Sequence, residues 1–149
     1  MKRSKRLDIV QQAAARTEKE RAERVGHAER HLVEMEQKLA ALEHYRAEYE
    51  AGFAARAGAG FGAVAVRDYQ TFLARLSEAL AQQKEMVLAA QKALDAERDH
   101  WREAAQRTHV VDNLMERWQG EETRAADRRD QNMSDELAMQ MRQARERAK

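Results

Sequence analysis

The chain has 149 residues, of which Ala, Glu, Lys, Arg and Leu supply 85, and it contains neither Pro nor Cys. This composition is typical of long helices and coiled coils. Leu, Ile, Val and Phe number only 23, too few for a thick globular core. The absence of Cys excludes disulfide scaffolds and cysteine-based zinc sites. The formal net charge of +1 gives no overall attraction to nucleic acid or to an anionic membrane.

The start of the chain is basic, at Lys2, Arg3, Lys5 and Arg6, where a signal peptide would need an apolar core. Aromatic residues for stacking on bases are not interleaved with this cluster, so we interpret it as a solvated terminus. No stretch approaches the roughly eighteen uncharged apolar residues of a membrane helix. We therefore expect a soluble cytoplasmic protein.

The first predicted element is a helix over about 5–51. Its apolar residues recur in two interleaved heptad rows, and before residue 25 the pattern fades into polar residues. One row is Val25, Leu32, Leu39 and Phe53, the other is Ala28, Met35, Leu42 and Tyr49, and the polar positions are Gln11, Glu18 and Arg21.

A turn is predicted over about 52–66, because four of the six glycines lie between Gly52 and Gly62. Each glycine inside a helix costs about 1 kcal/mol, so four glycines this close together should end the helix. The run lacks the following Lys-Ser or Lys-Thr of a phosphate-binding loop, and no strand precedes it. We interpret it as a hinge.

A second helix is predicted over about 67–146. Its seam is Leu73, Leu80, Val87, Leu94 and Trp101, continued with drift by Val111, Leu114, Met115 and Trp118. Two apolar stripes joined by a turn predict an all-α fold, an antiparallel coiled-coil hairpin with a longer, overhanging C-terminal helix, forming a single domain over 1–149. Folding about residue 59 would place residue i opposite 118 − i and leave the chain unpaired from about Met115.

No catalytic constellation is visible, so the sequence predicts a protein that is not an enzyme and that uses no cofactor. His27 and His31 lie one helical turn apart, but no third ligand stands at metal spacing, and we expect exposed histidines rather than a metal site. Met133, Leu137 and Met141 form a stripe near the end of the chain. The stripe fits either a partly exposed seam or an adaptable partner-binding face.

An apolar strip lies beside the seam at the start of the second helix. Phe72, Leu76 and Ala79, with Gln83, are spaced 4, 3 and 4 and therefore share one face. Leu42, Tyr45 and Tyr49 form a matching strip that should adjoin it. The two strips would either widen the contact between the helices or form a partner surface. We favour the partner surface, since Leu73 and Leu80 already fill the seam.

At these residues the chain resembles the FliJ family of flagellar type III export proteins, which are small helical hairpins of about this length. The likeness covers nearly the whole chain. It rests on the order and spacing of four segments: Tyr45-Arg46-Ala47-Glu48-Tyr49; Tyr69-Gln70-Thr71-Phe72-Leu73 with Leu76, Ala79 and Gln82; Trp101-Arg102-Glu103; and Asp130-Gln131-Asn132-Met133-Ser134-Asp135-Glu136.

The resemblance implies a fold like the two-helix stalk of rotary ATPase central subunits. It implies three kinds of partner, namely the flagellar export ATPase, the cytoplasmic domain of the export gate, and export chaperones. Association with the inner membrane at the flagellar base would be peripheral, through these partners. The gate-contacting residues would be Phe72, Leu76, Ala79 and Gln83, and the tail residues Arg124, Arg128, Gln131 and Asp135 would contact the ATPase.

Two residues depart from the family pattern: Gln83 stands where some relatives have His, and Asn132 where Lys is often found. Two alternative functions remain open. One is the equivalent stalk of a virulence-type secretion system. The other is a generic structural coiled coil, such as a homodimer.

Overall fold

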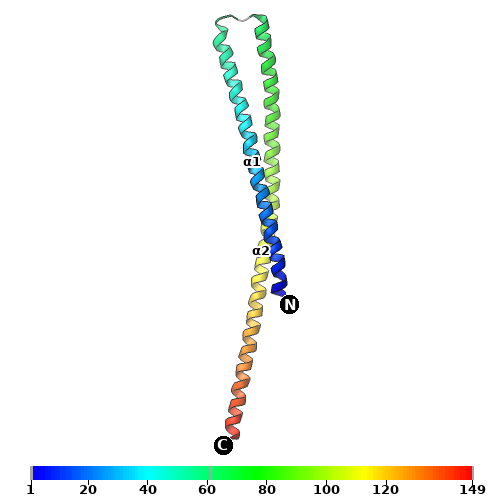
Figure 1. Cartoon of the computed structure of the whole chain (residues 1–149), viewed down its shortest axis with the longest axis vertical. Helices are drawn as coiled ribbons and strands as arrows, with labels where there is room; N and C mark the ends of the chain where they lie inside the picture. Colours follow the sequence, from blue (N-terminus) through cyan, green and yellow to red (C-terminus); the bar gives the residue numbers. More distant parts are fainter. Residues whose placement is uncertain (1, 61, 149) are drawn as a thin grey trace. The chain divides into compact units, whose positions relative to one another are not determined.

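The chain forms two long helices packed antiparallel as a hairpin (Figure 1). The computed structural model describes residues 2–60 and 62–148. Helix α1 spans Arg3–Ala57 and helix α2 spans Ala63–Arg147. The predicted all-α hairpin with a longer C-terminal helix is confirmed.

The connection between the helices is much shorter than the predicted turn over 52–66. Helix α1 continues through Gly52 to Ala57, and α2 already begins at Ala63. The ring of Phe53 stacks on that of Tyr69 with their centroids 3.7 Å apart, so tertiary packing offsets the intrinsic cost of a helical glycine. Gly60 has a φ of 80°, a left-handed conformation suited to glycine at a helix end. Phe61, which also falls in the predicted turn, lies outside the described residues.

Each helix carries a seam of alternating three- and four-residue steps over nearly its whole paired length. Polar residues occupy seam positions at which the apolar heptad pattern of the sequence is interrupted. All of these residues are buried or half-buried except Arg46 and Trp101. The seam of α1 is Ser4, Leu7, Gln11, Ala14, Glu18, Arg21, Val25, Ala28, Leu32, Met35, Leu39, Leu42, Arg46, Tyr49 and Phe53; that of α2 is Tyr69, Leu73, Leu76, Leu80, Gln83, Val87, Ala90, Leu94, Glu97, Trp101, Ala104, Thr108, Val111, Met115, Trp118, Glu122 and Ala125.

The chain divides into two compact units, one of residues 19–103 and one of residues 1–18 with 104–149. The core of the first unit is Leu32, Met35, Ala90 and Leu94, with Val25, Ala28 and Val87 packed against it. The core of the second is Leu7, Val111 and Met115, with Leu114 and Trp118 packed against it. Of the predicted α2 seam, Leu80 and Leu94 are buried as expected, whereas Leu73 and Val87 are half-buried.

The register differs by four residues from the predicted one, because the fold is centred on residue 61 rather than 59. In the unit of residues 19–103, Phe53 lies against Tyr69 and Leu32 packs in one cluster with Ala90, so residue i faces about 122 − i. The other unit follows the same rule, since Leu7 packs with Met115 and the hydroxyl of Thr108 donates to the carbonyl oxygen of Ala14. Met115 is therefore paired, contrary to expectation.

Among the described residues, no helix is both long and apolar enough to cross a lipid bilayer.

Candidate functional site

The two apolar strips near the hairpin turn meet in a cluster of five aromatic rings. The ring centroids of Tyr49 and Phe72 are 4.3 Å apart, and those of Tyr45 and Phe72 are 6.0 Å apart in an edge-to-face arrangement. Tyr49 also stacks on Tyr69 at 5.4 Å. These are favourable geometries for aromatic pairs. The prediction that the strips adjoin is confirmed.

Two members of the expected partner strip belong to the core instead. Leu76 is only 7% exposed and Gln83 only 8%. Nε2 of Gln83 donates a hydrogen bond of 2.9 Å to the backbone oxygen of Met35. A heptad seam needs two rows, and Leu73 and Leu80 supply one of them. Leu76 and Gln83 begin the other, so the expectation that they lie outside the seam is wrong.

The rest of the strip is closer to the surface. Phe72 and Ala79 are half-buried, and the side chain of Tyr45 is 48% exposed. Leu42 and Tyr49 are half-buried beside them. A molecule that approaches this face of the hairpin meets Tyr45, Phe72 and Ala79, while Leu76 and Gln83 are buried in the seam.

One long edge of the unit of residues 19–103 is lined by carboxylates. Directly after the seam row of Ala28, Met35, Leu42 and Tyr49, glutamate recurs at every heptad, and all four side chains are exposed. The facing edge of α2 carries Lys84 and Arg98, and Arg98 pairs with the first of these glutamates at 3.4 Å. The row consists of Glu29, Glu36, Glu43 and Glu50.

The opposite edge of the same unit is apolar. Phe72, Ala79, Met86 and Ala93 recur every seven residues on α2, and the side chain of Met86 is 53% exposed. Next to Met86 the two helices border a groove of about 450 Å³. Its walls are Met86, Ala89, Ala90 and Ala93 from α2 and His31, Met35 and Lys38 from α1, with Gln83 also contributing.

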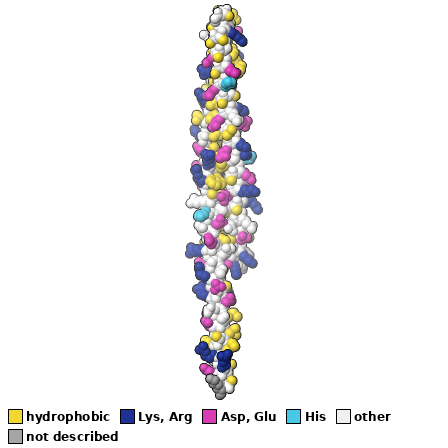
Figure 2. Space-filling model, turned by 90° about the vertical axis from the view of Figure 1, so that its left-hand side faces the viewer, with side chains coloured by type: hydrophobic (Ala, Val, Ile, Leu, Met, Phe, Trp, Pro, Cys, Tyr) yellow, Lys and Arg dark blue, Asp and Glu magenta, His cyan; other side chains and the backbone are white. Residues whose placement is uncertain are grey.

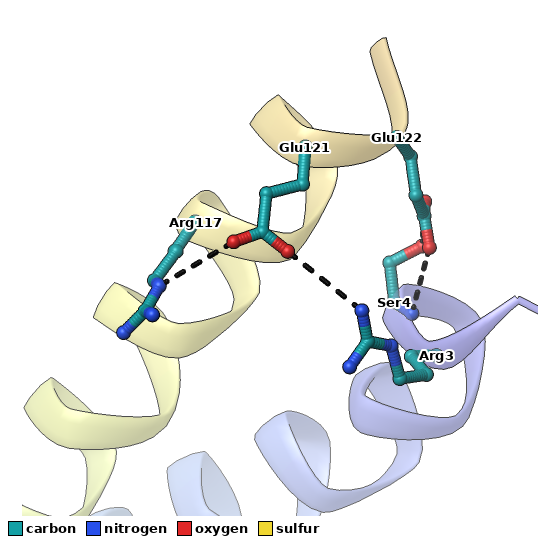
Figure 3. Close-up of polar contacts among 5 residues, drawn as sticks. All are labelled: Arg3, Ser4, Arg117, Glu121 and Glu122. Atoms are coloured by element: carbon teal, nitrogen blue, oxygen red, sulfur yellow. Dashed lines mark hydrogen bonds and ion pairs between the residues drawn. The ribbon is translucent and has the colours of Figure 1, made fainter. Parts of the chain in front are cut away.

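A polar clasp joins the first turn of α1 to α2 (Figure 3). The Ser4 hydroxyl donates to Oε2 of Glu122 at 2.6 Å, and the Ser4 amide donates to Oε1 at 3.3 Å. A carboxylate here satisfies a free amide at a helix N-terminus and faces the positive end of its dipole. The guanidinium of Arg3 lies 4.9 Å from the Trp118 ring centroid and 3.7 Å from Glu121, which also pairs with Arg117.

This clasp changes the acidity of Glu122. The hydrogen bond from the Ser4 hydroxyl, followed by the one from the Ser4 amide and by the charges of Lys2 and Arg3, holds the pKa of the Glu122 carboxyl below its usual value of 4.5, and partial desolvation opposes this shift. The carboxylate is therefore the form that the clasp stabilises.

Helix α2 continues for 25 residues past Glu122, whose carboxylate accepts hydrogen bonds from Ser4 of α1, before it ends at Arg147. From residue 127 to 148 every side chain is exposed, including Met133, Leu137 and Met141 at 58–62%. Apolar side chains gather along one side of this tail in Figure 2. We call residues 123–147 the tail.

The apolar stripe of the tail does not continue the hairpin seam. The seam row that passes through Glu122 and Ala125 would continue at positions 129, 132 and 136, which are Arg, Asn and Glu. The stripe of Met133 and Leu137 is displaced by one residue, or about 100° around the helix. The residues expected to contact an ATPase, at steps of 4, 3 and 4, share the face opposite the stripe. They are Arg124, Arg128, Gln131 and Asp135, all exposed.

The histidine pair belongs to the exposed surface. His27 Nδ1 lies 3.0 Å from the Arg30 guanidinium, and His31 is exposed at the rim of the groove. Within residues 2–60 and 62–148, no three His, Cys, Asp or Glu side chains are grouped so as to hold a metal ion.

Sequence reasoning missed the glutamate row and the Ser4–Glu122 clasp. The row could have been found by reading charges, as well as apolar residues, at heptad spacing. The clasp joins two polar residues 118 positions apart and had no local signal.

Comparison with known proteins gives one match. The model of the flagellar FliJ protein family matches residues 3–147, which is almost the whole chain. Searches among curated proteins and among solved structures give no significant match. Because the family model spans both helices and the tail, the chain belongs to the flagellar FliJ family, a component of the flagellar export apparatus.

Proposed function

We propose that this protein is a non-enzymatic stalk of the flagellar export apparatus. It links the export ATPase ring to the cytoplasmic domain of the export gate and assists export chaperones. Family membership supports its place in the export apparatus. A helical hairpin that offers two separate kinds of surface suits a linking role.

The tail is the observation that carries this proposal. Every side chain from residue 127 to 148 is exposed, so the tail lacks the tertiary packing that gives most protein helices their stability, and a partner would supply it. It combines an apolar stripe with a charged face on the other side. Such a helix fits the bore of a ring, where polar walls surround a limited apolar contact. The tail is thus the proposed ATPase-binding element.

The gate-binding face is proposed at the aromatic cluster. Tyr45, Phe72 and Ala79 offer apolar surface there, and half-buried aromatic side chains are frequent anchors of protein interfaces. Leu42 and Tyr49 support these residues, while Leu76 and Gln83 act from the core by fixing the shape of the face.

Truncation after Ala126 tests the role of the tail. This end point keeps Trp118, Glu121 and Glu122, which contact the first turn of α1. We expect an unchanged melting temperature, retained binding to the gate's cytoplasmic domain, and loss of stimulation of the export ATPase. Full stimulation by the truncated protein would show that the tail is not the ATPase-binding element.

Two full-length variants separate the two faces of the tail. A triple change of Met133, Leu137 and Met141 to Ser removes the apolar stripe, and a double change of Arg124 and Arg128 to Ala removes charge from the opposite face. If the helix enters a polar bore, both variants should weaken ATPase binding. Only the loss caused by the arginine variant should shrink as ionic strength is raised.

A further inference from the structure

The first part of α1, residues 3–18, has few apolar contacts with α2, and we call it the arm. Its seam positions are Ser4, Leu7, Gln11, Ala14 and Glu18. Only Leu7 and Ala14 among these are apolar, and both are buried. The other large apolar side chains of the arm, Ile9 and Val10, are 66% and 50% exposed. Apolar burial therefore contributes little to holding the arm in place.

Polar contacts hold the free end of the arm. Ser4 donates two hydrogen bonds to the Glu122 carboxylate (Figure 3), and the guanidinium of Arg3 lies 4.9 Å from the Trp118 ring centroid. Water can replace such partners when the arm leaves α2, so their net contribution is modest. The hydrogen bonds to a charged carboxylate are the strongest of them, which makes the Ser4–Glu122 clasp the main attachment of this end.

A charged stretch of the seam separates the arm from the rest of α1. Glu18 and Arg21 occupy two successive seam positions, and the next apolar one is Val25. The arm also belongs to a different compact unit from residues 19–103. Its departure from α2 would therefore leave the core of residues 19–103 intact. Segments of this kind open at a lower free energy than the whole protein.

The face of α2 that the arm covers is more apolar than the arm itself. Val111 and Met115 are 9% and 5% exposed, and Leu114 and Trp118 pack beside them. When the arm leaves, these side chains become accessible, and the unpaired part of α2 lengthens from the tail toward residue 104. An exposed apolar face of this kind marks an interaction site.

We propose that the arm is a displaceable cover, held closed by the Ser4–Glu122 clasp, and that its opening offers Val111, Met115 and Trp118 to the partner that binds the tail. The covered face and the tail lie on one continuous helix, so a single partner can reach both. The choice of partner rests on the proposed function and deepens it, because the export ATPase is the partner of the tail there. The closed arm is then an inhibitory contact in the isolated protein.

Hydrogen exchange of the full chain tests whether the arm opens on its own. Glu122→Ala removes both acceptors of the clasp, and a detached segment as short as the arm is only marginally helical. Exchange of amides in residues 7–18 should therefore become at least about tenfold faster, with no change in residues 28–42. Glu116→Ala, at an exposed position of the same helix, is the matched control and should leave both segments unchanged. Equal acceleration of both segments by Glu122→Ala, or of neither, would overturn the proposal.

Locking the arm tests what it covers. Ser4→Cys and Glu122→Cys can be joined by a short bismaleimide, and the pair is unique because the chain has no native Cys. The same double variant with each thiol capped by N-ethylmaleimide is the control, since both forms lack the clasp. The capped form should stimulate the purified export ATPase at least as well as wild type, and the cross-linked form should lose most of this stimulation.

Equal stimulation by the capped and cross-linked forms would overturn the inhibitory contact. Failure of the wild type to stimulate the ATPase would instead overturn the proposed function and, with it, the choice of partner. The exchange experiment on the isolated protein would still decide whether the arm opens.

Discussion

At the scale of single residues, the side chain of Gln83 sets the alignment of the two helices. The residue is 8% exposed and lies among apolar seam residues, and its side-chain amide donates a hydrogen bond to the backbone oxygen of Met35. Apolar seam residues tolerate a slip by one heptad, because each leucine finds an equivalent site. A buried polar group does not, because a slip would leave its donor without an acceptor.

Replacing Gln83 by Leu should therefore stabilise the hairpin and also allow a second population in which the two helices are shifted by one heptad. We expect the free energy of unfolding to rise by about 1 kcal/mol, since a buried polar group is exchanged for an apolar one. Register can be followed by disulfide cross-linking, because the chain has no native Cys. Cysteines at Glu29 and Arg98, which are in contact in the native alignment, report that alignment, and cysteines at Glu29 and Ala105 report a slip of one heptad. Equal cross-linking patterns with and without Gln83 would contradict this role.

The Ser4–Glu122 clasp should make stability depend on pH in a defined way. The folded pKa of Glu122 is depressed below 4.5, so its contribution is fully present above the unfolded pKa and is lost as pH falls through the folded one. The melting temperature of wild type should exceed that of Glu122→Gln at neutral pH. This difference should be constant down to about pH 5 and vanish at lower pH. A difference that grows on acidification would rule out the carboxylate as the stabilising form.

Sequence reasoning reached the apolar seam residues and missed the polar ones for a physical reason. Leu32 and Leu94 can be assigned to the core from the sequence, because burying a leucine side chain is favourable by its transfer free energy alone. Glu97 stands in the seam of α2, and its Oε2 atom is buried without a hydrogen-bond partner among the described residues. The seam position of Glu97 follows only from its spacing to the neighbouring seam residues Leu94 and Trp101, because a glutamate side chain by itself favours an exposed position.

At the scale of the helices, burial of the seam should dominate stability. Leu94 is 2% exposed, and replacing it by Asp both removes apolar burial and places a charge in the core. We expect a loss of about 4 kcal/mol or more, seen as a much lower melting temperature by circular dichroism at 222 nm. Leu88→Asp, on the exposed side of the same helix, should change stability by less than about 0.5 kcal/mol. Equal effects of the two variants would contradict the observed seam.

At the helix boundaries, tertiary packing overrides the intrinsic helix propensities of the residues. Glycine density predicted that α1 would end near residue 51, yet the helix runs to Ala57 because Phe53 has Tyr69 to stack on. The residue that does break the helix is Gly60, whose left-handed φ few other residues adopt easily. The density of glycine thus predicted where the turn lies, and the contact between Phe53 and Tyr69 determines how short it is.

At the scale of the whole chain, a shift of four residues in register decides where the tail begins. The predicted register came from centring the turn on residue 59, and a shift of four residues is not a multiple of seven. The seam rows, which fix the alignment modulo one heptad, are therefore compatible with the observed register and not with the predicted one. With the observed register, Trp118 and Glu122 hold the first turn of α1. The segment in which every described side chain is exposed therefore starts at residue 127 rather than near Met115.

Hydrogen–deuterium exchange should reveal this boundary. Backbone amides of residues 127–147 make helical bonds but lack packing, so they should exchange at least about a hundredfold faster than amides around Leu32 and Leu94. The step in protection should fall between residues 118 and 127. Protection that persists through the tail in the isolated protein would contradict its unpaired state.

The row of Glu29, Glu36, Glu43 and Glu50 has a consequence for assembly. A two-helix hairpin with two apolar edges could add helices on both sides and grow without limit. Here the exposed carboxylates of one edge disfavour the approach of a further apolar helix, whereas the corresponding positions of the other edge carry no Asp or Glu. We therefore expect an additional helix to be accepted only on the second edge. Replacing the four glutamates by Gln should raise the tendency of the protein to self-associate.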